Sequence, residues 1–102
     1  MPVSTHPTPL RLGFDIGSVA LKLVVTDVRM HVLDRVYRRT HGSPLTTAWE
    51  VFREVAARWP QASWEVIAGS GSAAVVVCES LAAPQLNEVL AQAAAIRHLC
   101  PQ

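Results

Sequence analysis

The chain has 102 residues, room for one domain of common size, which excludes a two-lobed enzyme unless the chain is part of one. Hydrophobic residues make up 50% of the sequence, charged residues 17%, and the mean hydropathy is +0.24, so ample apolar surface can be buried and disorder is disfavoured. The net charge of +1 is too balanced for a nucleic-acid binder that relies on a basic face. Lys22 is the sole lysine, and every other basic residue is an arginine.

Cysteine content and hydropathy predict a cytoplasmic location. Cys78 and Cys100 form no Cys-x-x-Cys pair, so neither a disulfide scaffold nor a zinc site is indicated. No apolar run approaches the roughly 18 to 20 residues that span a bilayer, and the N-terminus lacks the pattern of a signal peptide. We therefore expect no membrane contact and no nucleic-acid partner.

The first half of the chain predicts an antiparallel meander. Residues 1–9 hold three prolines among Ser and Thr, so we expect a disordered N-terminal segment and a folded domain over 10–102. Apolar and polar residues alternate from Leu10 to Ile16, which is typical of a strand. Two more strands are expected over Leu21–Val25 and Val32–Tyr37, and the short connections favour antiparallel pairing.

The second half predicts helices that alternate with one strand. Apolar residues recur at three- and four-residue spacing between Ser43 and Trp59, which indicates an amphipathic helix capped by Ser43. A buried strand is expected over Trp64–Ala68, a short helix over Ala73–Leu81 and a further helix over Pro84–His98. The order βββαβαα predicts an α/β domain with a mixed sheet and helices packed on it. Because the sequence stops directly after a helix, we expect a continuation into another strand.

The strongest chemical motif lies between the first two predicted strands. Asp15 can hold a magnesium ion through water, because magnesium prefers carboxylates and keeps most of its hydration shell. Gly17 lets phosphate oxygens approach the backbone, where the N–H groups of Ser18 and Val19 can point at them. The Ser18 hydroxyl is a further donor, and Lys22 adds a positive charge. The alternative interpretation is an ordinary hairpin with a solvated Asp and Lys.

Gly69, Ser70 and Gly71 form a second candidate anion-binding loop, because they precede a predicted helix whose first N–H groups are unpaired. Spacing alone favours an ordinary strand-to-helix turn with Ser72 as its cap. The segment matches neither a Walker A loop nor a Gly-x-Ser-x-Gly nucleophile elbow.

These motifs, in order and spacing, resemble the N-terminal part of the BadF/BadG/BcrA/BcrD ATPase family. Members of this family activate 2-hydroxyacyl-CoA dehydratases and benzoyl-CoA reductases and are also called CoA-substrate-specific enzyme activases. The resemblance covers most of the chain from Leu10 onward. The segments that carry it are Leu12–Ser18, Lys22–Val25, Tyr37–Pro44, Ala68–Gly71 and Asn87–Ala91.

The resemblance implies an actin-like ATPase with a ribonuclease H-like half-lobe, in which the hairpin from Asp15 to Lys22 contacts the phosphates of ATP and magnesium. Full-length members are homodimers that share a [4Fe-4S] cluster and pass an electron to a dehydratase or reductase partner. Neither Cys78 nor Cys100 matches a cluster ligand, so the cluster ligands are absent from this chain. Val19 stands where many members carry Thr, and Ser72 where an Arg is common. We expect no catalytic residue and no turnover of ATP by these 102 residues alone.

Two other functions are compatible with the same motifs. A ribonuclease H-like nuclease would need further carboxylates beside Asp15, and Glu65 and Glu88 are the only candidates to reach it. A non-catalytic docking or dimerisation module would keep the half-lobe fold and present an exposed apolar sheet edge.

Overall fold

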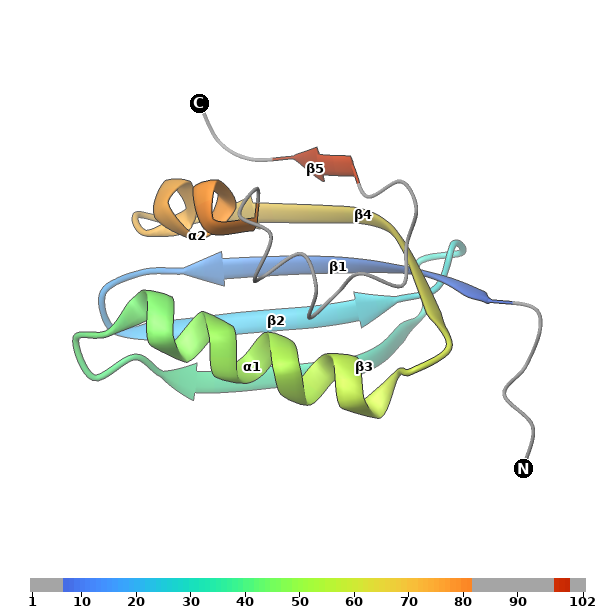
Figure 1. Cartoon of the computed structure of the whole chain (residues 1–102), viewed down its shortest axis with the longest axis horizontal. Coiled ribbons are helices and arrows are strands. Elements are labelled where there is room, and N and C mark those ends of the chain that lie inside the picture. Colours follow the sequence, from blue (N-terminus) through green and yellow to red (C-terminus); the bar gives the residue numbers. More distant parts are fainter. Residues whose placement is uncertain (1–6, 82–96, 100–102) are drawn as a thin grey trace.

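The fold was analysed in a computed structural model, which describes residues 7–81 and 97–99. Within these residues the chain forms five strands and two helices (Figure 1). In chain order they are β1 (Thr8–Ile16), β2 (Ala20–Thr26), β3 (Val32–Arg39), α1 (Pro44–Arg58), β4 (Ala62–Ser70), α2 (Ala74–Leu81) and β5 (Arg97–Leu99).

The described strands form one mixed sheet in the order β3-β2-β1-β4-β5. The first three strands are an antiparallel meander, as predicted, whereas β4 runs parallel to β1 and β5 runs parallel to β4. This order and these directions are those of a ribonuclease H-like, actin-like half-lobe. The predicted fold class is therefore confirmed.

Two predicted boundaries are wrong. Thr8 and Pro9 belong to β1 and pair with Ala62 and Ser63, so the expectation of disorder is wrong for these two residues. The Thr8 amide donates a hydrogen bond of 2.8 Å to the carbonyl of Gln61, which holds this end of β1 next to β4. The helix expected over 84–98 is wrong at residues 97 and 98, because residues 97–99 form a strand that pairs with β4. The rest of that predicted range and residues 1–6 lie outside the described residues.

The hydrophobic core lies between one face of the sheet and both helices. Along β1, Leu10, Leu12, Phe14 and Ile16 are 0–5% exposed, so every second side chain faces the core. The ring of Phe14 packs edge-on against Phe52 of α1, with 5.5 Å between the centroids. Both helices contribute to the same cluster, through Val51, Phe52 and Val55 from α1 and Ala74 and Val77 from α2. The opposite face of the sheet is contacted by neither described helix (Figure 1).

Helix α1 is held on the sheet by polar contacts to β3 as well as by the core. The Asp34 carboxylate, 16% exposed, accepts hydrogen bonds from Arg58 Nε at 2.8 Å and from Trp59 Nε1 at 3.0 Å. Burial by itself raises the pKa of Asp34, but these hydrogen bonds and the charge of Arg58 outweigh it, so the pKa lies below its ordinary value of 3.8. A second pair, Arg38 with Glu54 at 2.8 Å, is more exposed. Neither described helix is long and apolar enough to cross a membrane.

Replacing Asp34 with Asn should lower the free energy of unfolding by about 1–3 kcal/mol near neutral pH, because two charge-assisted hydrogen bonds lose the charge of their acceptor. Since the pKa of Asp34 is lower in the folded than in the unfolded chain, its contribution is present above the unfolded pKa and disappears as the pH falls through the folded pKa, below 3.8. Urea denaturation of both proteins near pH 7 and near pH 3 measures this. An equal difference at the two pH values would contradict the assignment. Glu54→Gln, which alters the more exposed pair, is the control and should cost no more than about 0.5 kcal/mol.

Candidate functional site

Side chains from four strands meet in one row across the sheet. Asp15 of β1 lies directly opposite Lys22 of β2 and beside Ser70 of β4, and Lys22 in turn lies opposite Tyr37 of β3. Directly paired residues share a face, so these side chains project from the face that the helices leave uncovered. Lys22 is exposed and forms no ion pair with Asp15 or with any other residue in the described part of the chain. Its charge is therefore available to a ligand.

A shallow hollow of about 280 Å³ lies at this row. Ser70 Oγ donates a hydrogen bond of 3.0 Å to Oδ1 of Asp15, which fixes the orientation of the carboxylate. The residues that line the hollow are Gly13, Phe14, Asp15, Lys22, Val24 and Ser70.

The turn that joins β1 to β2 has its carbonyl groups engaged inside the protein. Thr40, which is 2% exposed, donates its hydroxyl to the carbonyl of Ser18 and its amide to the carbonyl of Val19 at 2.9 Å. The amides of Ser18 and Val19 have no hydrogen-bond partner among the described residues, and both residues are exposed. The turn therefore has two amides without a partner in the described chain, whereas the carbonyls of Ser18 and Val19 are occupied. Thr40 was not predicted as a site residue. Its sequence signals are its position directly after a strand and its place in Tyr37–Pro44, one of the segments that carry the family resemblance.

The second candidate loop packs against the end of β1. Gly71 has φ +102°, and a β-carbon there would lie 2.4 Å from the carbonyl oxygen of Ile16 and 2.7 Å from Oδ1 of Asp15. A β-carbon on Gly69 would lie 2.3 Å from the ring of Phe14. Both glycines are thus required by close packing and, at Gly71, by a left-handed backbone. Ser70 is the member of this loop that reaches the row of polar side chains.

The start of α2 is partly engaged by the same contact. The amide of Ala73, directly before the helix, donates to the carbonyl of Ile16 at 3.0 Å. The amide of Ala74 also donates, to the carbonyl of Gly71 at 3.1 Å, so two donors at this end of the helix are used within the protein. Anion binding by Gly69, Ser70 and Gly71 as a separate loop stays a prediction.

Gly17 differs from these glycines because the protein itself does not require it. Its φ lies outside the left-handed region, and a β-carbon would make only an ordinary contact with Ser72 Oγ at 3.7 Å. The packing of the chain gives no reason for glycine at position 17. The close approach of a ligand to the backbone would give one.

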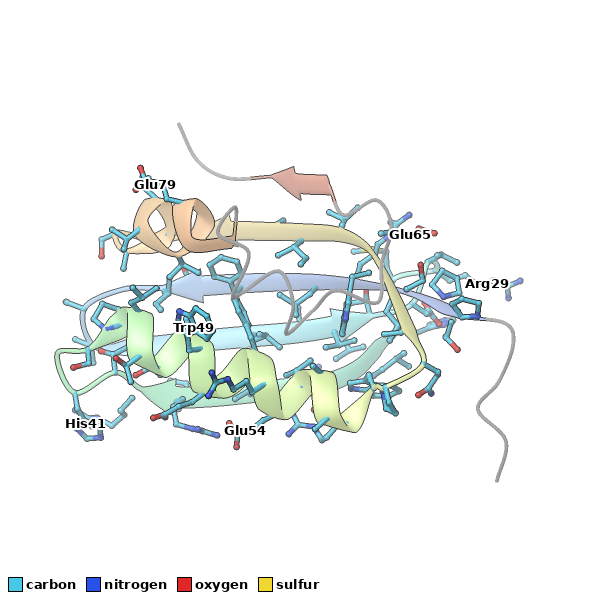
Figure 2. The ribbon with its side chains drawn as sticks, viewed as in Figure 1. Arg29, His41, Trp49, Glu54, Glu65 and Glu79 are labelled. Carbon is cyan, nitrogen blue, oxygen red and sulfur yellow. The ribbon has the colours of Figure 1, made fainter. Side chains whose placement is uncertain are left out.

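The donor set fits a hydrated magnesium ion but no site built from several protein ligands. Asp15 offers one carboxylate, and magnesium commonly keeps several waters when it is held by one or two carboxylates and phosphates. No group of three or more His, Cys, Asp or Glu residues that could hold a metal is found in residues 7–81 and 97–99. Glu65 follows the position paired with Leu10, so it lies about 15 Å along the sheet from Asp15. Figure 2 shows Glu65 and Arg29 at the end of the sheet opposite Glu79 and His41. Glu65 therefore cannot complete a nuclease site, and Glu88 lies outside the described residues.

Comparison with known proteins gives fold-level likeness only. No family model and no curated protein match the chain. Two solved structures of the Ppx/GppA phosphatase of Aquifex aeolicus are similar to this chain, with TM-scores of 0.47 and 0.48 and sequence identities of 10% and 12%. The matches cover 91% and 93% of this chain and 36% of each of the two phosphatase chains. An exopolyphosphatase from Cytophaga hutchinsonii has a TM-score of 0.47 at 14% identity over 89% of this chain and 34% of its own. The chain thus spans about a third of these proteins. Because these TM-scores are below 0.5, the likeness does not assign the fold or the function. The fold class rests on the order and direction of the strands.

The contrast between the glycines gives a stability test. Gly71→Ala should lower the free energy of unfolding by about 2 kcal/mol or more, because it forces a β-carbon into a left-handed residue that faces the Ile16 carbonyl. Gly17→Ala should change it by less than about 1 kcal/mol, since the position is sterically open. Urea denaturation of the two variants and the wild type measures both. Similar losses in the two variants would mean that the packing at Gly17 is tighter than the structure indicates.

Proposed function

We propose that this chain is the phosphate-binding half-lobe of an actin-like ATPase and that the β1–β2 turn contacts the phosphates of a magnesium nucleotide. The observation that carries the proposal is the turn itself. Thr40 holds the carbonyls of Ser18 and Val19, the amides of these two exposed residues have no partner in the described chain, and the unpaired charge of Lys22 lies in the adjacent row. Backbone amides and a lysine at the end of a strand are a suitable donor set for a phosphate chain.

Each side chain of the row has a separate task in this proposal. Lys22 balances phosphate charge, and Ser18 adds a hydroxyl donor. Asp15, held by Ser70, orients the water molecules of the magnesium ion. A magnesium ion held there would supply positive charge that neutralises the phosphates. Thr40 acts as a positioning residue, because it fixes the direction of the turn without facing the ligand.

The chain alone binds the nucleotide weakly and does not hydrolyse it. Phosphoryl transfer requires donors and cations around the transferred group as well as a positioned water molecule. The turn and the polar row approach a phosphate chain from one side only. The active protein is then a longer one in which further elements close the site.

The more specific form of the proposal is the role implied by the sequence resemblance. There the longer protein uses ATP hydrolysis to drive an electron onto a 2-hydroxyacyl-CoA dehydratase or benzoyl-CoA reductase, as a cytoplasmic homodimer with a [4Fe-4S] cluster. The support for this role consists of the sequence motifs from Leu12 to Ala91, and the cluster ligands would lie outside this chain.

Dimerisation through an exposed apolar strand is disfavoured by the charges on the described edge. Strand β3 is one of the two edge strands of the described sheet, beside β5 at the other edge, and it carries Arg35, Arg38 and Arg39. Charged side chains on an edge oppose pairing with a second copy of the same strand.

Nucleotide binding can be tested by nuclear magnetic resonance of the 15N-labelled chain titrated with magnesium ATP and, separately, with tripolyphosphate. The amide signals of Ser18 and Val19 should shift with both ligands, because phosphate is the shared group. Lys22→Met should weaken binding about tenfold or more, since a charge-assisted contact is worth about 1.5–3 kcal/mol. Gly17→Ala should also weaken it while the fold remains intact.

Arg29→Met is the matched control, because it removes one positive charge at the far end of the sheet (Figure 2) and should leave binding unchanged. Equal loss in the Lys22 and Arg29 variants would indicate a nonspecific charge effect and overturn the site. Robust magnesium-dependent ATP hydrolysis by the purified chain, abolished by Asp15→Ala, would refute the statement that the chain alone is not catalytic.

A further inference from the structure

The sheet face that neither described helix contacts carries a second, larger hollow, of about 390 Å³. We call this face the open face. Its hollow adjoins the candidate phosphate site, because Gly13 and Val24 line both. The residues that line it are Arg11, Leu12, Gly13, Val24, Thr26, Met30, Val66 and Ala68.

The floor of the hollow has the character of a covered surface. Strands β1 and β4 run parallel, and sheets made of parallel strands alone are buried on both faces, so this half of the mixed sheet resembles a covered one. Gly13, Val66 and Ala68 are small or apolar at the positions where a solvent-facing sheet would carry polar side chains. A β-carbon on Gly13 would meet only Val24 Cγ2 at 3.7 Å, so the chain's own packing does not require glycine there. The missing side chain leaves room for something placed on the sheet.

Arg11 in this hollow lacks a partner for a buried donor. Its Nε atom is buried without a hydrogen-bond partner, and Nη1 reaches only the Met30 sulfur at 3.8 Å. No carboxylate in the described ranges forms an ion pair with this guanidinium. A permanently charged group with an unsatisfied buried donor is costly unless an acceptor reaches it. A carboxylate supplied from outside would satisfy it.

The charges around the hollow have one dominant sign. Strand register places Arg35 with Val24, and Arg39 with Ala20, on the same face as Lys22 and Arg11. Asp15 is the one acidic residue that a register pair places on this face within the described strands. Glu65, the extra residue of the β4 bulge, lies beside Val66, the partner of Arg11, but forms no ion pair with Arg11 in the described part of the chain. A second copy of the same face would therefore be repelled, and an acidic occupant attracted.

We propose that the open face binds an acidic amphipathic helix of a partner protein. Its apolar stripe packs on Val24, Val66 and Ala68, and one of its carboxylates pairs with Arg11. A helix fits better than an added strand, because a sheet face offers side chains while its backbone groups are already paired within the sheet. This inference is independent of nucleotide binding at the β1–β2 turn.

The test uses a fluorescent synthetic helix of about 18 residues, long enough for five turns, with leucines at i, i+3, i+4 and i+7 spacing flanked by glutamates. Anisotropy titrations with the whole chain should show saturable binding. A peptide of the same composition in scrambled order should bind about tenfold or more weakly, because it cannot present an apolar stripe. Equal binding of the two peptides, or binding of neither, overturns the proposal.

Arg11→Met should weaken binding of the acidic helix about tenfold or more, because truncating one partner of a buried charge pair is costly. Replacing the helix's central glutamates with glutamine should weaken binding to the wild type similarly and add little further loss in Arg11→Met. Arg53→Met, on helix α1 and so on the covered side of the sheet, is the matched control and should bind as the wild type does. Unchanged binding in Arg11→Met overturns the role of Arg11.

Gly13→Val provides a second variant that does not alter charge. It fills the floor of the hollow and should also weaken helix binding, whereas its melting temperature should stay close to that of the wild type. Arg11→Met should keep or raise the melting temperature, because it removes an unsatisfied buried donor. Arg11→Met should leave the shifts that tripolyphosphate causes at Ser18 and Val19 unchanged, because Arg11 does not line the phosphate hollow. Wild-type affinity of Gly13→Val for the helix would place the peptide elsewhere.

Discussion

The pleat of β1 determines where both the core and the candidate sites lie. This strand has an antiparallel neighbour on one side and a parallel neighbour on the other, so its alternation sets the face of residues in three strands. With Phe14 and Ile16 in the core, Arg11, Gly13 and Asp15 must face the other way. A slip by one residue would bury Asp15 and expose Phe14, which makes the register energetically decisive. The hydrophobic core therefore fixes the functional face as well.

Local patterns predict the meander and the first helix, because their signals are repeated over many residues. Alternation identifies β1, β-branched runs joined by short connections identify β2 and β3, and the spacing of apolar residues before Pro60 identifies α1 within one residue at either end. Long-range pairing has no comparable local signal. The parallel contact between β1 and β4, with its bulge beside Leu10, extends β1 back to Thr8. Pairing with β4 likewise makes a strand of residues 97–99, where periodicity favours a helix.

The candidate site could be predicted in part, for the same reason. Asp15, Gly17, Ser18, Val19 and Lys22 are close in sequence, so one motif reveals them. Ser70 reaches Asp15 only through the parallel register, and Thr40 holds the turn from 22 residues away. The sequence does not show why a glycine is needed at a given position. Gly69 and Gly71 avoid clashes inside the protein, whereas Gly17 has open space around it. Structure separates these cases because it shows what a β-carbon would meet.

The candidate phosphate site and the hollow of the open face are neighbours that share Gly13 and Val24, so an occupant of one would change the electrostatic surroundings of the other. Lys22 is exposed, so water and salt weaken its attraction for phosphate in the free chain. A helix on the open face would exclude water from one side of Lys22 and strengthen that attraction. A carboxylate of the helix near Lys22 would weaken the attraction of Lys22 for phosphate. A carboxylate near Arg11 would weaken it much less, because Arg11 lies four residues along β1 from Asp15, the partner of Lys22. Pairing at Arg11 is therefore the arrangement in which both ligands can occupy this face together.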